Sequence, residues 1–161
     1  MLVVPLLLAI AFQLAPPKPI ETPHLILRLS SERPGGPPAS RVMTLVIDVT
    51  PKPKMHVYAP QQKDYIPVAI TLDANPAFTP HGAVFPKPEK LFFEPLKEMQ
   101  LVYSKPFRIV QNVRLLPPHS DVDEIIVTGK LRYQACDDAI CYLPKDVPVS
   151  WTIRSKSAPV Q

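Results

Sequence analysis

The sequence of 161 residues predicts an all-β fold, an antiparallel sandwich of two sheets. Six segments alternate apolar and polar residues with period two, which is the pattern of half-buried strands. The 23 prolines disfavour long helices, because an interior proline removes an amide donor and clashes with the preceding turn. No strand–helix–strand rhythm indicates a parallel sheet. With 46% apolar residues for one core, we expect a single immunoglobulin-like domain over residues 24–154.

Three of the alternating segments lie in the first half of the chain. Leucines share one face of residues 25–29, four apolar residues do so in residues 43–49, and residues 66–72 repeat the pattern. A short strand is predicted at residues 55–58. The composition of residues 32–39 (ERPGGPPA) indicates a loop between the first two strands.

The second half predicts three more long strands and a short one. Residues 107–115, 125–133 and 147–153 alternate clearly, and residues 100–103 form a short apolar run. The proline-rich stretch 75–98 has no strand pattern, so we expect a long irregular segment there. Such segments on compact domains often serve as lids or binding loops.

The N-terminal residues resemble a secretory signal. Residues 2–12 are apolar and uncharged, although no Lys or Arg precedes them, and they contain Pro5. A membrane-spanning helix needs about 20 apolar residues, so no stable span is expected. We interpret residues 1–15 as the signal-like segment, 16–23 as a proline-rich tether and 155–161 as a polar tail. Export to the periplasm would place the domain in an oxidising compartment.

Charge and motifs exclude several functions. The net charge is +4, but the lysines are scattered singly, which indicates a solvated surface and no nucleic-acid partner. The sequence has no glycine-rich phosphate loop and no serine in a nucleophile motif. Nucleotide and hydrolase chemistry therefore have no support.

The two cysteines of the chain are the strongest candidates for chemistry. Cys136 and Cys141 are separated by four residues within the run YQACDDAICYLP. If the extended chain folds back on itself there, paired strand positions bring their Cα atoms to about 4.5–5.5 Å. A disulfide requires about that separation.

Three roles for this pair were weighed. A structural disulfide closing so short a loop removes little unfolded-chain entropy, worth about 2 kcal/mol. A metal site is disfavoured because none of the histidines lies at a short ligand spacing from another or from the cysteines. These histidines are His24, His56, His81 and His119. Composition alone leaves the choice between a structural and a redox-active disulfide open.

The neighbours of the cysteines suit a redox role. The charges of Asp137 and Asp138 disfavour the thiolate form, and Tyr133 and Tyr142 are candidates for excluding water from the sulfurs. Such a pair would stay unreactive until a partner protein docks, which is what an electron relay in an oxidising compartment needs.

The cysteine run resembles the N-terminal periplasmic domain of the DsbD family of thiol:disulfide interchange proteins, also described as a disulfide-bond corrector domain. The matching positions are Tyr133, Gln134, Cys136, Cys141, Tyr142 and Pro144. Residues 55–58 (MHVY) resemble the short aromatic strand of the family, and residues 91–103 fall where the family carries a cap loop. Well-known members have five residues between the cysteines, where this chain has four.

The resemblance implies an immunoglobulin-like domain that accepts electrons from a thioredoxin-like domain. It would pass them to periplasmic partners, including disulfide isomerases and the thioredoxin-like reductants of cytochrome c maturation. In the family the second cysteine bonds to the partner, so Cys141 would face the partner and Cys136 would resolve the mixed disulfide.

The resemblance also implies roles for aromatic residues. Tyr58 and His56 would line the sulfur pocket, beneath a cap loop that shields the disulfide and opens when a partner binds. Phe92 and Phe93 are the candidates for the apolar contact of this cap, with ordinary core aromatics as the alternative.

We therefore expect an exported thiol–disulfide oxidoreductase module without a cofactor, which relays two electrons between thioredoxin-like proteins. The multi-span membrane section of the family is missing from the sequence, so a separate membrane protein would be the electron donor. The alternative is a non-catalytic binding or adaptor sandwich with a structural disulfide.

Overall fold

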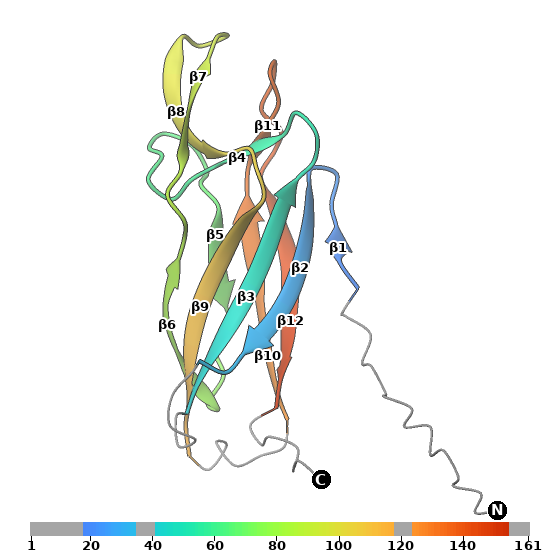
Figure 1. The fold of residues 1–161 in the computed structure, drawn as a ribbon, viewed down its shortest axis with the longest axis vertical. Coiled ribbons are helices and arrows are strands. Elements are labelled where there is room, and N and C mark those ends of the chain that lie inside the picture. The colour runs from blue at the N-terminus through green and yellow to red at the C-terminus, as the bar shows by residue number, and fades with distance from the viewer. Residues whose placement is uncertain (1–17, 35–40, 118–123, 155–161) are drawn as a thin grey trace, which may run out of the picture.

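The computed structural model describes residues 18–34, 41–117 and 124–154, which form strands and loops without a helix. Two antiparallel sheets pack face to face (Figure 1). The five-stranded sheet contains, in spatial order, β1 (Ile20–Glu21), β2 (Leu25–Glu32), β3 (Val42–Pro51), β9 (Phe107–Leu115) and β6 (Phe78–Val84). The three-stranded sheet contains β12 (Lys145–Ile153), β10 (Ile125–Tyr133) and β5 (Ala69–Leu72). The predicted all-β sandwich is confirmed.

The core lies between these two layers. Alternate residues of β2, β3 and β9 face alternate residues of β10 and β12, so each strand has one buried face. The indole nitrogen of Trp151 on β12 donates a hydrogen bond to the backbone carbonyl of Val46 on β3 at 3.2 Å. This bond ties the two layers together and satisfies the indole in the core.

Gly129 permits the close approach of β5 to β10. A Cβ atom added there would collide with the backbone carbonyl oxygen of Thr71 and approach Leu72. Because Gly129 pairs with Leu72 in the ladder, a side chain at this position would push β5 off the sheet.

A third sheet lies at one end of the sandwich. Its spatial order is β11 (Ala135–Cys136), β4 (His56–Tyr58), β8 (Glu98–Tyr103) and β7 (Glu89–Phe93). Figure 1 shows the β7–β8 hairpin, in yellow, projecting beyond the ends of the long strands near the tip of the chain that follows β11. We call this third sheet with its connecting loops the sulfur end, and the two larger sheets the body.

Two predictions about the chain were wrong. Residues 75–98, expected to be irregular, contain β6, β7 and the first residue of β8. β6 is an edge strand that carries Pro80 and a register shift, and much of it is exposed, so it shows no alternation. The expected tether includes β1, which pairs with β2 through only two residues, too few to produce a pattern. Residues 1–17, 35–40, 118–123 and 155–161 lie outside the described part, including the predicted signal-like segment and polar tail.

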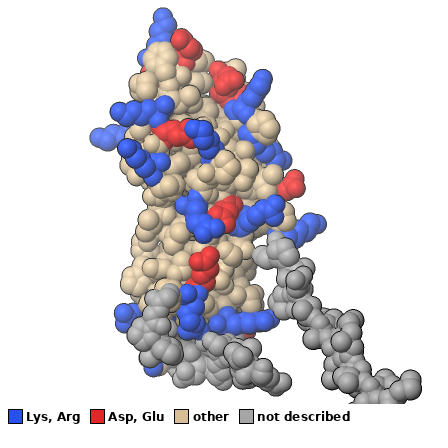
Figure 2. Space-filling model, in the orientation of Figure 1, with Lys and Arg blue, Asp and Glu red and all other residues tan. Residues whose placement is uncertain are grey.

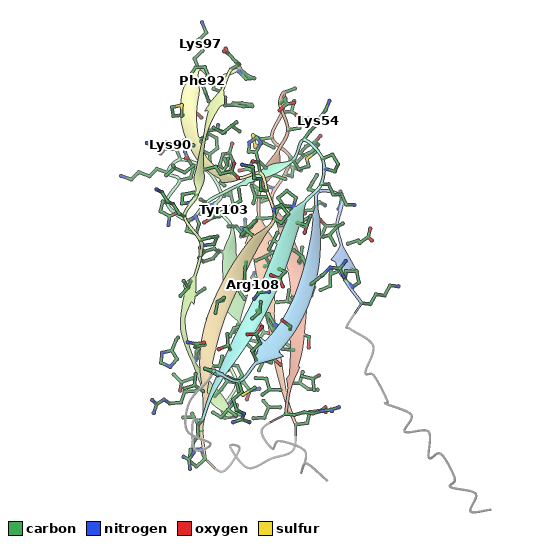
Figure 3. The ribbon with its side chains drawn as sticks, viewed as in Figure 1. Lys54, Lys90, Phe92, Lys97, Tyr103 and Arg108 are labelled. Carbon is green, nitrogen blue, oxygen red and sulfur yellow. A yellow bond between two sulfur atoms is a disulfide. The ribbon has the colours of Figure 1, made fainter. Side chains whose placement is uncertain are left out.

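Charged side chains are spread over the face drawn in Figure 2, with acidic groups between basic ones. Arg108 on β9, in the middle of this face in Figure 3, bonds Asp48 on β3 through two nitrogens at 2.7 and 3.0 Å. Among the described residues, no helix is long and apolar enough to cross a membrane.

Candidate redox site

Cys136 and Cys141 form a disulfide, with their sulfurs 2.10 Å apart. The two residues face each other across an antiparallel bridge, and their Cα atoms are 4.0 Å apart. This separation is slightly shorter than the spacing expected from the sequence. The chain folds back because β10 continues through Gln134 into β11 and then returns toward β12. The Gln134 amide secures the return by donating to the carbonyl oxygen of Tyr142 at 3.1 Å.

The two cysteines differ in exposure. Cys136 is fully buried in a small cluster with Tyr58 and Val102, whereas Cys141 is exposed. β11 pairs with β4 and holds Cys136 inside, while Cys141 lies on the outer limb of the loop. The solvent-exposed member of the pair is therefore Cys141, and Cys136 is shielded from solvent.

The hydroxyl of Tyr58 lies against both sulfurs, 3.1 Å from Cys136 Sγ and 3.2 Å from Cys141 Sγ. A disulfide sulfur carries no hydrogen, so the hydroxyl is the donor to whichever sulfur it faces. The Tyr58 side chain is fully buried, and burial, assisted by Tyr65 and Glu98, raises its pKa to about 12. The phenol therefore remains protonated at neutral pH.

Three further polar residues surround Tyr58, and they were missed from the sequence. The ring of Tyr65 stacks on that of Tyr58 at 4.4 Å, and its hydroxyl donates to Glu98. The amide nitrogen of Gln100 donates to the same Glu98 oxygen at 2.8 Å. Bonds from Gln100 and Tyr65 lower the pKa of Glu98, so its carboxylate stays charged. The available signal was the alternation of β8, which places Gln100 on the buried face with Val102.

His56 lies beside the buried Cys136. It pairs with Cys136 between β4 and β11, and its ring meets those of Tyr58 and Phe93 edge-on at 6.2 and 6.4 Å. Burial lowers its pKa, outweighing the opposite effect of Asp138 and other neighbours, so the imidazole is neutral at neutral pH. Within the described residues its Nε2 atom and Gln100 Oε1 have no hydrogen-bond partner.

Asp137 braces the loop between the cysteines. Its carboxylate accepts hydrogen bonds from the backbone amides of Ala139 and Ile140, both at 2.8 Å, and from the hydroxyl of Tyr142 at 2.7 Å. These bonds, led by the one from Ile140, lower the pKa of Asp137 to about 2. The charge next to Cys136 is thus engaged by the loop itself, and Tyr142 acts on the loop through Asp137.

Tyr133 lies in the body core. Its hydroxyl donates to Thr22 Oγ1 at 2.9 Å and lies 3.4 Å from Nδ1 of His24. The ring of Tyr142 packs against the same histidine at 4.5 Å. Of the four aromatic or histidine candidates for the sulfur pocket, Tyr58 contacts the sulfurs and His56 adjoins them. Tyr133 and Tyr142 hold the strands that enter and leave the loop.

The β7–β8 hairpin, which occupies the expected position of the cap, separates the two phenylalanine candidates. Phe93 is buried and faces His56, and Leu91 packs on the cluster around Tyr58. Phe92 is 49% exposed and pairs with Met99 on the opposite face. Lys97, at the tip of the hairpin in Figure 3, has a φ of 50° and closes the turn. The inner face of the hairpin thus covers the buried half of the disulfide.

In the described part of the chain, no group of three or more histidine, cysteine, aspartate or glutamate side chains could hold a metal ion. Cys136 and Cys141 are bonded to each other, His24 packs against Tyr142, and His81 is exposed on β6. The chemistry available at the sulfur end is that of the disulfide.

The β-sandwich carries a disulfide between one buried and one exposed cysteine, which is an arrangement that thiol–disulfide exchange can use, and the family of the chain decides the class. The sequence matches the family model described as "Thiol:disulfide interchange protein DsbD, N-terminal" over residues 38–150. The chain belongs to this family, as the cysteine motif predicted.

Of two solved structures of similar domains, that of ScsB agrees with the fold. The N-terminal periplasmic domain of ScsB from Proteus mirabilis is 13% identical with a TM-score of 0.55, and the match covers 85% of this chain and 50% of that one. This chain therefore spans about half the length of the ScsB structure. The N-terminal domain of Neisseria meningitidis DsbD in the reduced form is 15% identical with a TM-score of 0.47, and the match covers 72% of this chain and 80% of that one. No curated protein matches the sequence.

Proposed function

We propose that this domain works in the periplasm as a relay that carries two electrons through Cys136 and Cys141 between thioredoxin-like proteins. The observation that carries the proposal is the unequal exposure of the two bonded cysteines, with residue Cys141 exposed and residue Cys136 buried. An exchange protein needs one sulfur that a partner can attack and one that is kept for the second step. A separate membrane protein supplies the electrons.

The reaction proceeds in two exchanges. A partner thiolate attacks Cys141 Sγ, the disulfide breaks, and Cys136 leaves as a thiolate. A second thiol of the partner then attacks the mixed disulfide and releases the domain with both cysteines reduced. The same steps in reverse hand the electrons to an oxidised partner. No cofactor takes part, because the cysteine pair itself carries both electrons in its dithiol form.

Trapping of a mixed disulfide distinguishes the proposed relay from nonspecific thiol–disulfide exchange. With Cys136→Ala, the remaining Cys141 should accumulate a mixed disulfide with a thioredoxin-like protein in periplasmic extract, visible on non-reducing gels. The matched variant Cys141→Ala, whose remaining sulfur is buried, should trap little. Equal trapping by both variants, or none with any thioredoxin-like protein, would contradict the relay.

The reduction potential separates the relay from the adaptor alternative. A structural disulfide of an exported protein has a potential below about −300 mV, whereas exchange proteins lie above that value. We expect a titration read by thiol alkylation to place the Cys136–Cys141 pair in the higher range. A value in the lower range would favour the adaptor sandwich.

A further inference from the structure

Within the exchange reaction proposed above, on which this inference rests, we infer that Tyr58 is a catalytic residue whose hydroxyl donates a hydrogen bond to the departing Cys136 thiolate. Tyr58 lies in the small cluster with Cys136 and Val102, apart from the body core, and its ring stacks on that of Tyr65. Tyr58 directs its hydroxyl to the sulfurs, 3.1 Å from the one that must leave.

Burial creates the need for such a donor. Cys136 is fully buried against Tyr58 and Val102, with Tyr65 and Leu91 packed around them. A thiolate formed in apolar surroundings lacks the water that would solvate it, and this energetic cost of forming the thiolate slows the opening of the disulfide. A hydrogen bond from a fixed donor to an anion is stronger than one to a neutral group, and it therefore favours the state in which the charge develops.

In the first exchange, the bond between Cys136 and Cys141 is replaced by a bond between the partner and Cys141. The thiolate of the attacking partner forms a bond to Cys141 Sγ, and the electron pair of the broken S–S bond passes to Cys136 Sγ. That sulfur accepts the hydrogen bond from the Tyr58 hydroxyl. When the second partner thiol has closed the disulfide of the partner, the departing Cys141 and Cys136 thiolates take protons from water. The partner dithiol is oxidised and the domain is reduced by the same two electrons.

The surroundings of Tyr58 make its hydroxyl a lasting donor. A thiol titrates near pH 8.5 in the absence of perturbation, far below the pKa of about 12 for Tyr58. The proton therefore stays on the phenol oxygen when the thiolate forms. The charge of Glu98, which Tyr65 and Gln100 hold in place, is one reason why the phenol resists ionisation.

The hydroxyl is placed to act in both directions of exchange. Its distance to Cys141 Sγ is 3.2 Å, nearly equal to its distance to Cys136 Sγ. When Cys136 returns as the nucleophile that expels a partner from Cys141, the same donor holds its thiolate near the sulfur that it must attack. One residue thus stabilises Cys136 as leaving group and as nucleophile.

The test uses Tyr58→Phe and a matched variant, Tyr103→Phe. Tyr103 is also buried in the third sheet, but its hydroxyl donates to the carbonyl oxygen of Pro86 at 2.7 Å. Reduction of each oxidised protein by dithiothreitol at pH 7 is followed by alkylation and mass measurement. Tyr58→Phe should react about tenfold more slowly than the parent, less than the loss at an oxyanion hole because sulfur accepts weaker hydrogen bonds. Tyr103→Phe should react at the parental rate.

A titration of the Cys136 thiol tests whether the slower reduction of Tyr58→Phe comes from the lost hydrogen bond. In a Cys141→Ser background, the midpoint of the Cys136 thiol titration is read from its Cβ chemical shift. Loss of the hydrogen bond in Tyr58→Phe should move this midpoint to higher pH, whereas simple loosening of the site would admit water and move it to lower pH. An unchanged or lower midpoint would overturn the inference. Because neither measurement uses a protein partner, the inference can fail while the relay stands, and the trapping result can fail while Tyr58 still acts as stated.

Discussion

The body and the sulfur end of this domain are built by different rules. In the body, long strands alternate buried and exposed residues, and the buried face is almost wholly apolar. At the sulfur end, short strands bury His56 and Gln100, each with a polar atom that has no partner among the described residues, whereas the larger body has one such residue, Gln111 on β9. All three described non-glycine residues with positive φ also lie in turns at or beside this end. The sulfur end thus concentrates buried polar groups and left-handed backbone in a small part of the domain, which is where the relay proposal places the reaction.

The two fully buried tyrosines show the same contrast. Tyr133, where β10 ends, donates a hydrogen bond to Thr22 and joins the turn between β1 and β2 to the core. Tyr58, on β4, gives its hydroxyl to the disulfide. Both satisfy a buried donor, as burial requires. The partner of Tyr133 is a threonine, so substitution of Tyr133 should lower stability. The partner of Tyr58 is the disulfide, so substitution of Tyr58 should slow thiol–disulfide exchange.

Removal of both sulfurs should separate the two regions most completely. In Cys136→Ser with Cys141→Ser, electron exchange with thioredoxin-like proteins should disappear, because no bond remains to be exchanged. The free energy of unfolding should fall by no more than about 2 kcal/mol, since the loop closed by the disulfide is short. Urea titration and an exchange assay on the same preparation test both parts. Unfolding of the double variant would show that the disulfide holds the body together.

The opposite result is expected for a body residue. Leu131 on β10 is fully buried in the body core, in register with Val147 on β12 and Ile70 on β5. Leu131→Ala should lower the free energy of unfolding by about 2–5 kcal/mol through lost burial and a residual cavity. The reduction rate per folded molecule should not change. A slower rate in the folded fraction would mean that body packing reaches the disulfide.

These two regions also differ in how well the sequence predicted them. Alternation identified every strand of the body except β1 and β6, because a sheet with one buried face imposes period two. Leu25, Leu27 and the apolar positions of β9 and β12 lie where the pattern placed them. β6 escaped because edge strands tolerate proline and need no apolar face, and Pro80 there resembled a loop signal.

At the sulfur end, the sequence identified the chemistry but only part of the geometry. The spacing of Cys136 and Cys141 predicted the bond, and the resemblance of residues 55–58 to the short aromatic strand of the family proposed Tyr58 and His56 for the sulfur pocket. The cluster that surrounds Tyr58 depends on contacts between residues far apart in the sequence, such as Tyr65 with Glu98, 33 positions apart, and Tyr58 with Cys136, 78 positions apart. Periodicity describes one strand at a time, so it cannot predict such contacts.

The β7–β8 hairpin, which lies where a cap is expected, offers a further test of the sulfur end. Phe93→Ala should remove an edge contact to His56 and uncover the buried sulfur, lowering the free energy of unfolding by about 3 kcal/mol at most and speeding reduction by dithiothreitol. Phe92→Ala is the matched control, because this ring is exposed and should change neither quantity measurably. Equal effects of the two substitutions would show that the hairpin does not cover the disulfide with one face.

The smallest effect is expected from the charge that braces the cysteine loop, and it is visible only in acid. The pKa of Asp137 is about 2 in the folded protein against an ordinary 3.8, so the folded state binds this proton less readily than the unfolded chain. Its contribution is present above pH 4 and is lost as the pH falls from about 4 to 2. Asp137→Asn is a fitting comparison, since an amide oxygen can still accept from Ala139 and Ile140 but carries no charge. Urea titrations at several pH values should show a shallower acid decline for the variant. Parallel curves would mean that the loop is held by its backbone alone and that the sulfur end owes no stability to this carboxylate.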